Sequence, residues 1–187
     1  EVIPCEGYTH QTRYTLPVAP SPNLKTQQAI LLYPSTCLFE GTVMSVGRGT
    51  DNPFTLYGHP SYKGGPEGLP EGSRGVTFTP ESRPGAKNPP LKGRGCRGAE
   101  MTGVSPDTII ARGFDLNYLI DAYRHMPRGE RFFTTFIDKL AGTPELRRQI
   151  ESGMSVDEIR ATWQDDLDAF RRVRAKYLLY PDTSTEK

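Results

Sequence analysis

Glycine and proline are distributed unevenly along the chain, and this distribution limits the folds open to it. Of the 36 glycines and prolines, 28 lie in residues 1–105 of the 187-residue sequence. Glycine destabilises helices through its backbone freedom, and proline does so through its fixed φ and missing N–H group. Because strands are favoured first and helices follow without βαβ alternation, the sequence predicts an α+β fold. Its front half is expected to be turn-rich, mixed or antiparallel β structure, and its C-terminal half helical.

Short apolar runs between turn residues mark the predicted strands of the front half. The run at residues 27–33 is short enough for either a strand or a buried helix, and its end at Pro34 favours a strand. Residues 12–16 alternate like an exposed strand, and the other predicted strands are residues 54–57, 76–78 and 96–102, with loops at residues 60–75 and 80–95.

Helix signals dominate after residue 105. Ser105-Pro106 has the residue types of an N-cap and a first helical position. Apolar residues recur at helical spacing over 116–123 and 133–140. Ser155 and Glu158 form a capping-box pattern that begins another helix. That helix is expected to turn one apolar stripe toward the core: Ile159, Trp163, Leu167 and Phe170. Residues 182–187 are expected to fray.

The composition argues against several classes of function. The formal net charge is +1, so the chain lacks the basic excess typical of nucleic-acid-binding domains. No apolar run approaches about 18 residues, so no membrane span is predicted. Three cysteines allow at most one disulfide within the chain, and none is expected to be required for folding. The three histidines, His10, His59 and His125, are far apart, and we expect neither a metal site nor a cofactor.

The most unusual combination of charged residues and glycines lies in two short polar motifs, FEGT at 39–42 and GRGT at 47–50. Arg48 lies between two glycines, which allow a loop to approach a ligand closely. Its planar guanidinium suits a carboxylate or phosphate, and Glu40 can pair with it or face a substrate. A structural turn with a surface Glu–Arg pair fits the same residues. The basic cluster around Lys87 is likewise either solvated surface or a cationic wall over an anion site.

Several longer motifs resemble those of the NamZ family of exo-acting β-N-acetylmuramidases. The matching stretches are PSPN at 20–23, YPSTCLFEGT at 33–42, GRGT at 47–50, PF at 53–54, LAGTPELRRQIESG at 140–153 and YLLY at 177–180. Members of this family are exported proteins of cell-wall recycling, and they release N-acetylmuramic acid from the non-reducing end of peptidoglycan fragments.

The resemblance implies that this chain corresponds to the C-terminal domain alone. Residues 1–22 are then an extended segment and linker continuing from an upstream Rossmann-like domain, and residues 23–187 are the C-terminal α+β domain. The active site is expected in the cleft between the two domains, so the 187-residue chain should lack appreciable activity by itself. The implied partners are muramic acid saccharides and the upstream domain, without nucleic acid or a membrane span, and the implied location is periplasmic or otherwise exported.

The resemblance also gives the candidate site residues. Arg48 is expected to bind the lactyl carboxylate of muramic acid, with Glu40 holding the guanidinium and Thr50 adding a hydrogen bond. The full set of candidate substrate-binding residues is Glu40, Arg48, Gly49, Thr50, Asn23 and Lys87. Glycosidases usually need two carboxyl groups, and Glu40 is the one catalytic candidate in these motifs, so the catalytic residues stay unassigned. A non-catalytic peptidoglycan- or carbohydrate-binding module is the alternative, and a purely structural domain is a third hypothesis.

Overall fold

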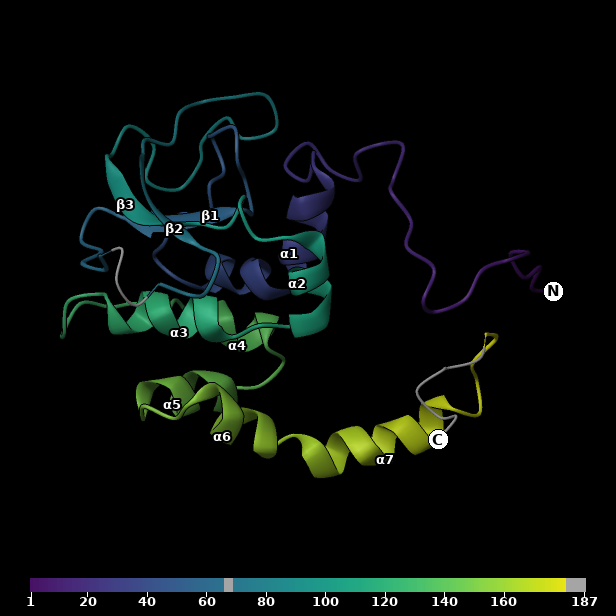
Figure 1. The fold of residues 1–187 in the computed structure, drawn as a ribbon. Coiled ribbons are helices and arrows are strands. Elements are labelled where there is room, and N and C mark those ends of the chain that lie inside the picture. Colours follow the sequence, from purple (N-terminus) through teal and green to yellow (C-terminus); the bar gives the residue numbers. More distant parts are fainter. Residues whose placement is uncertain (66–68, 181–187) are drawn as a thin grey trace.

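The computed structural model describes residues 1–65 and 69–180. Within these residues, a three-stranded antiparallel sheet lies in the first half and seven α-helices lie mostly in the second, which confirms the predicted α+β fold. Figure 1 shows the sheet, helices α1–α4 and helices α5–α6 in succession, with α7 extending away from the body. The elements are α1 (Gln27–Thr36), the 3₁₀-helix η1 (Cys37–Gly41), β1 (Leu56–His59), β2 (Arg74–Phe78), β3 (Cys96–Glu100), α2 (Pro106–Arg112), α3 (Asn117–Arg124), α4 (Ile137–Leu140), α5 (Glu145–Glu151), α6 (Val156–Ala161) and α7 (Gln164–Arg174).

Strand β3 is the centre of the sheet and pairs antiparallel with both β1 and β2. Strands β2 and β3 confirm the strands predicted around residues 76–78 and 96–102. The strand predicted at 54–57 begins later, at Leu56. Phe54 has a φ of 63°, and this left-handed conformation is incompatible with an extended strand.

Residues 27–33 form part of helix α1, so the predicted strand is wrong. Thr26 caps the helix, because its hydroxyl accepts a hydrogen bond from the Ala29 N–H at 3.1 Å. Pro34 lies inside the last turn and does not end the helix, since the chain continues directly into η1. Ala29 and Leu32 are buried on one face, a spacing that suits a helix and not a strand.

The predicted helix starts at two serines are confirmed. Ser105 accepts a hydrogen bond at the start of α2, and Ser155 and Glu158 form the reciprocal capping box of α6. The helix predicted over residues 133–140 is shorter than expected and spans only Ile137–Leu140. Phe133 lies before it, in an isolated β-bridge with the front half of the chain.

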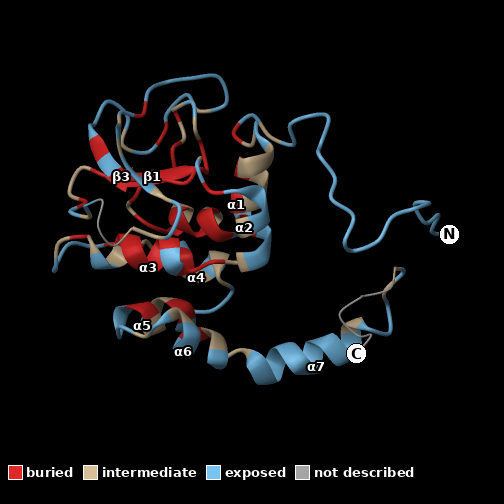
Figure 2. Ribbon diagram, viewed as in Figure 1, coloured by how far each residue is buried: buried red, intermediate tan, exposed pale blue. Residues whose placement is uncertain are grey.

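The apolar stripe predicted for residues 159–170 does not belong to one buried helix. The chain bends between α6 and α7, so Ile159 is fully buried and Trp163 packs against the core, whereas Leu167 and Phe170 are exposed. Figure 2 shows α7 as an exposed helix beyond the buried body. The expected core position of Leu167 and Phe170 is therefore wrong, because helical spacing alone does not show what a face packs against.

Residues 1–20 are exposed throughout and form no helix or strand, so the exposed strand predicted at residues 12–16 is wrong. They run outside the body on the same side as α7, and the Tyr8 and Tyr180 rings meet at 4.8 Å between centroids. The three cysteines are free thiols, with Cys5 exposed, Cys37 half-buried and Cys96 buried. In the part of the chain that the structure describes, no helix has both the length and the apolar character needed to cross a membrane. The predicted fraying of residues 182–187 lies outside the described residues.

Two matched substitutions test the division between the packed body and α7. Ile159→Ala should lower the free energy of unfolding by about 2–5 kcal/mol, because it leaves a cavity in the core. Phe170→Ala should change it by less than about 0.5 kcal/mol, because that ring is exposed. Equilibrium urea unfolding of the two variants measures both values. A similar decrease in the free energy of unfolding in both variants would show that α7 is packed against the body in solution.

Candidate functional site

The structure brings Glu40 and Arg48 into direct contact. The Nε and Nη2 groups of Arg48 donate to the same Glu40 oxygen, Oε1, at 2.9 and 2.7 Å. The guanidinium also lies over the Phe54 ring, with Cζ 4.9 Å from the ring centroid. Both charged side chains keep about 30% of their surface exposed, at 30% for Arg48 and 29% for Glu40. The pair is therefore fixed in place and still accessible to a ligand.

The glycines on either side of Arg48 are required by the loop geometry. Gly47 and Gly49 have φ values of 80° and 82°, a region that residues with a Cβ rarely adopt. A Cβ on Gly49 would also lie 2.5 Å from the Glu81 carbonyl oxygen. The close approach that Gly49 allows is to another loop of the same chain, and Gly49 does not line the pocket described next, so its approach to a ligand stays a prediction.

The Glu40–Arg48 pair lines a pocket of about 440 Å³ whose other walls are mainly apolar. We call this cavity the Arg48 pocket, and its remaining lining residues are Phe39, Thr42, Met44, Val46, Pro90 and Phe136. Its volume lies within the range of about 300–1,000 Å³ typical of small-molecule sites. One ion pair in an apolar cavity suits a ligand that carries a charged group beside apolar surface.

Backbone contacts between the two halves of the chain build this pocket. The Val43 N–H donates to the Phe132 carbonyl, and the Thr134 N–H donates to the Gly41 carbonyl, each at 2.9 Å. Gly41 lies so close to α4 that a Cβ there would be 2.6 Å from the Ile137 Cα. These contacts hold the start of α4 against η1, and they place Phe136 on the same pocket as Glu40.

The other predicted site residues lie outside the lining of the Arg48 pocket. The Thr50 hydroxyl donates to the Gly47 carbonyl at 2.7 Å and so stabilises the loop. Asn23 is buried and donates to the Gly85 carbonyl at 3.0 Å, which joins two loops. Lys87 is exposed, as are the other cations of its loop, Arg83, Lys92 and Arg94. This exposure favours the solvated-surface interpretation of the cluster over a cationic wall.

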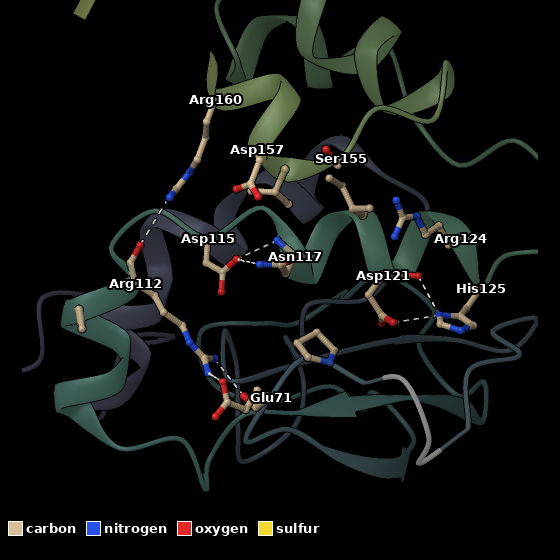
Figure 3. Close-up of a pocket in the computed structure, with 14 residues that line it drawn as sticks. Glu71, Arg112, Asp115, Asn117, Asp121, Arg124, His125, Ser155, Asp157 and Arg160 are labelled. Carbon is tan, nitrogen blue, oxygen red and sulfur yellow. Dashed lines mark hydrogen bonds and ion pairs between the residues drawn. The ribbon is translucent and has the colours of Figure 1, made fainter. Parts of the chain in front are cut away.

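A second pocket, which the sequence analysis did not identify, lies between α3 and α6 and has a volume of about 670 Å³. Figure 3 shows its polar lining, in which most charged groups have partners within the chain. Arg112 donates to Glu71 at 2.7 Å, and the Arg160 guanidinium contacts the Phe114 carbonyl. Asp115 accepts two hydrogen bonds from Asn117.

A buried carboxylate, Asp121, lies at the wall of this second pocket. Its Oδ2 accepts hydrogen bonds from Tyr57 and Tyr62 at 2.5 and 2.9 Å, and its Oδ1 lies 2.9 Å from Nδ1 of His125. Burial, reinforced by the charge of Asp121, raises the pKa of both tyrosines, so both stay protonated donors. The spacing of four positions between Asp121 and His125 was the available sequence signal. Among the described residues, no group of three or more His, Cys, Asp or Glu side chains is placed to hold a metal ion.

Known proteins match this fold over most of the chain. Residues 31–180 match the family described as "Exo-beta-N-acetylmuramidase NamZ, C-terminal". The peptidoglycan β-N-acetylmuramidase NamZ of Bacillus subtilis (strain 168) is 35% identical over 172 residues, which are 87% of this chain and 40% of that protein. The chain therefore spans well under two thirds of the length of this relative.

Two crystal structures from Bacteroides fragilis NCTC 9343, both of DUF1343 family proteins, have similar folds. One is 49% identical, with a TM-score of 0.88 over 97% of this chain and 49% of the other. The second is 20% identical, with a TM-score of 0.61 over 94% of this chain and 49% of the other, and its likeness concerns the fold alone.

Gly41 provides a test of how the Arg48 pocket is built. Gly41→Ala should lower the free energy of unfolding by about 1–3 kcal/mol, because the new methyl group collides with the backbone of α4. Gly75→Ala is the control, since a Cβ there meets nothing within 4 Å, and it should change stability by less than about 1 kcal/mol. Urea unfolding of the two variants makes the comparison. Equal stability of both variants would mean that η1 and α4 are not held this closely.

Proposed function

The chain belongs to the family of the C-terminal domain of the exo-β-N-acetylmuramidase NamZ, and we propose that it is the substrate-binding half of such a glycoside hydrolase. Its substrates are muramic acid saccharides derived from peptidoglycan. The observation that carries this proposal is the accessible Glu40–Arg48 pair in an otherwise apolar pocket. Family membership supplies the substrate class, and the pocket supplies a chemical reason for its selection.

The chemistry of muramic acid matches this pocket. N-acetylmuramic acid differs from N-acetylglucosamine by a lactyl ether, which adds one carboxylate and one methyl group. A guanidinium has five N–H donors, and Glu40 engages only the Nε and Nη2 side of Arg48. The Nη1 side of Arg48 binds the lactyl carboxylate in this proposal, and the exposed Pro90 offers apolar surface to the methyl group. Glu40 fixes the guanidinium in advance, so little side-chain entropy is lost on binding.

Glycoside hydrolysis requires more than this pocket contains. Two carboxyl groups usually flank the scissile bond, and Glu40 is the one acidic residue among those that line the Arg48 pocket. Because Glu40 is already bonded to Arg48, we assign it an orienting role. The catalytic groups in this proposal come from a further domain of a longer protein, and the active site lies in the cleft between that domain and this one.

Exposed apolar side chains support such a neighbouring domain. Of the 14 exposed large hydrophobic side chains in the described residues, 11 lie in residues 1–18 or 167–179. Both segments lie on the same side of the body (Figure 2). Large exposed apolar patches commonly mark interaction surfaces. The residues from 1 to 22 act as a linker in this account, and residues 23–187 as the domain itself.

Two further points belong to the proposal. The protein is exported or periplasmic, since peptidoglycan lies outside the cytoplasmic membrane. A non-catalytic peptidoglycan- or carbohydrate-binding module is the second candidate function, and the presence of a single acid in the Arg48 pocket favours it.

We expect the purified 187-residue chain to show no appreciable muramidase activity, because its pocket lacks the second carboxyl group. Hydrolysis of a chromogenic N-acetylmuramide measures this directly, with the NamZ of Bacillus subtilis as the positive control. Robust turnover by the chain alone would overturn the assignment of the catalytic groups to another domain. If a longer protein that contains this domain and its neighbouring domain bound the sugar without cleaving it, the result would favour a non-catalytic binding module.

Arg48→Lys should weaken binding of N-acetylmuramic acid by about 10–150-fold, because a charge-assisted hydrogen bond is worth about 1.5–3 kcal/mol. Lysine keeps the charge but loses the planar pair of donors. Binding of N-acetylglucosamine, which has no carboxylate, should be unchanged. Nuclear magnetic resonance titration of the chain with both sugars provides the affinities.

The control for this variant is Arg83→Lys, since Arg83 pairs with Asp51 on the surface and does not line the Arg48 pocket. It should bind both sugars like the unchanged chain. If Arg48→Lys lost equal affinity for both sugars and also had lower thermal stability, Arg48 would only stabilise the loop.

A further inference from the structure

We propose that Phe136 is the platform on which the pyranose ring of the bound sugar packs. This inference rests on the proposed function of the Arg48 pocket and adds a binding residue of different chemistry to it. Phe136 lines the same pocket as Glu40 and Arg48, and 47% of its surface is exposed.

The exposure of Phe136 contrasts with the burial of its neighbours. Phe132, Phe133 and Ile137 are at most 6% exposed. A ring that served the core would lie with them. The chain instead holds Phe136 out at the pocket, while Phe133 before it and Ile137 after it are buried.

The backbone that carries this ring is held in place by its neighbours. The Phe136 N–H donates to the Thr134 hydroxyl at 3.3 Å, and the Thr134 N–H donates to the Gly41 carbonyl at 2.9 Å. Ile137, the next residue, is fully buried against η1. An aromatic ring whose backbone is fixed on both sides loses little entropy when a ligand covers it.

A pyranose has two kinds of surface, and the Arg48 pocket has a counterpart for each. Its hydroxyl edge is polar, whereas the face formed by its C–H groups is apolar and packs well on an aromatic ring, which offers a large flat surface. Phe136 therefore recognises the ring that both amino sugars share. Arg48 recognises the lactyl carboxylate, which only the muramic sugar carries. The two residues should affect affinity in different ways.

The test compares Phe136→Leu and Phe136→Trp by titration with the methyl β-glycosides of N-acetylmuramic acid and N-acetylglucosamine. Leucine keeps apolar bulk but removes the ring, and it should weaken binding of both sugars by about 3–10-fold. Tryptophan keeps an aromatic face and should restore affinity to within about 2-fold of the unchanged chain. Sugar-ring protons should shift upfield in the unchanged chain, through the aromatic ring current, and this shift should vanish in Phe136→Leu.

The matched control is Phe170→Leu, the same substitution of an exposed phenylalanine on α7 outside the Arg48 pocket. It should leave both affinities and the upfield shifts unchanged. Unfolding midpoints of all variants are measured alongside, and Phe136→Leu should match the unchanged chain.

The outcomes separate this inference from the function on which it rests. Unchanged affinities in Phe136→Leu, with Arg48→Lys still selective for the muramic glycoside, would overturn the role of Phe136 alone. If Phe136→Leu lost affinity for the muramic glycoside only, the inference would also be overturned, because the ring would then contact the lactyl group and not the shared pyranose. Failure of the unchanged chain to bind the muramic glycoside through Arg48 would overturn the proposed function and this inference together.

Discussion

The close approach of η1 to α4 is the constraint on which the Arg48 pocket depends. Gly41 allows it, because any side chain at this position would collide with the backbone at Ile137. Hydrogen bonds from Val43 and Thr134 then join the turn-rich front half of the chain to the helical half. Glu40 and Phe136 come from opposite halves, and they share a pocket only because this junction is so tight.

The Arg48 pocket and the pocket between α3 and α6 use charge in different ways. In the Arg48 pocket, one ion pair is partly exposed among apolar side chains, so part of the guanidinium can still donate to a ligand. In the pocket between α3 and α6, most of the charged lining groups are engaged by other groups of the chain, and Asp121 is buried under two tyrosines and a histidine. A buried carboxylate that accepts two tyrosine hydrogen bonds and lies beside a histidine mainly specifies the packing around it. This contrast is why we assign ligand binding to the smaller pocket.

Local signals in the sequence predicted much of the fold and part of the site. The caps at Ser105 and Ser155 and strands β2 and β3 are short-range features, and the structure confirms them. Helix α1 differs from the strand predicted there because its last turn accommodates Pro34 and Thr26 caps its start. The exposure of α7 could not be predicted, since a helical stripe does not reveal its partner. Phe136 was missed for the same reason.

The candidate site shows the same limit. Glu40 and Arg48 lie close in sequence, so their pairing could be anticipated as one alternative. Asn23 and Lys87 belong to neighbouring loops, and the structure shows that they do not line the Arg48 pocket. The pocket between α3 and α6 gathers side chains from segments far apart in the chain, which no local pattern reveals.

The most direct test of the central claim is a crystal structure of the 187-residue chain with bound N-acetylmuramic acid. We predict that the lactyl carboxylate lies within hydrogen-bonding distance of the Arg48 guanidinium, while Glu40 keeps its own contact on the opposite edge. A sugar bound in the pocket between α3 and α6, or a carboxylate turned away from Arg48 into solvent, would contradict the account.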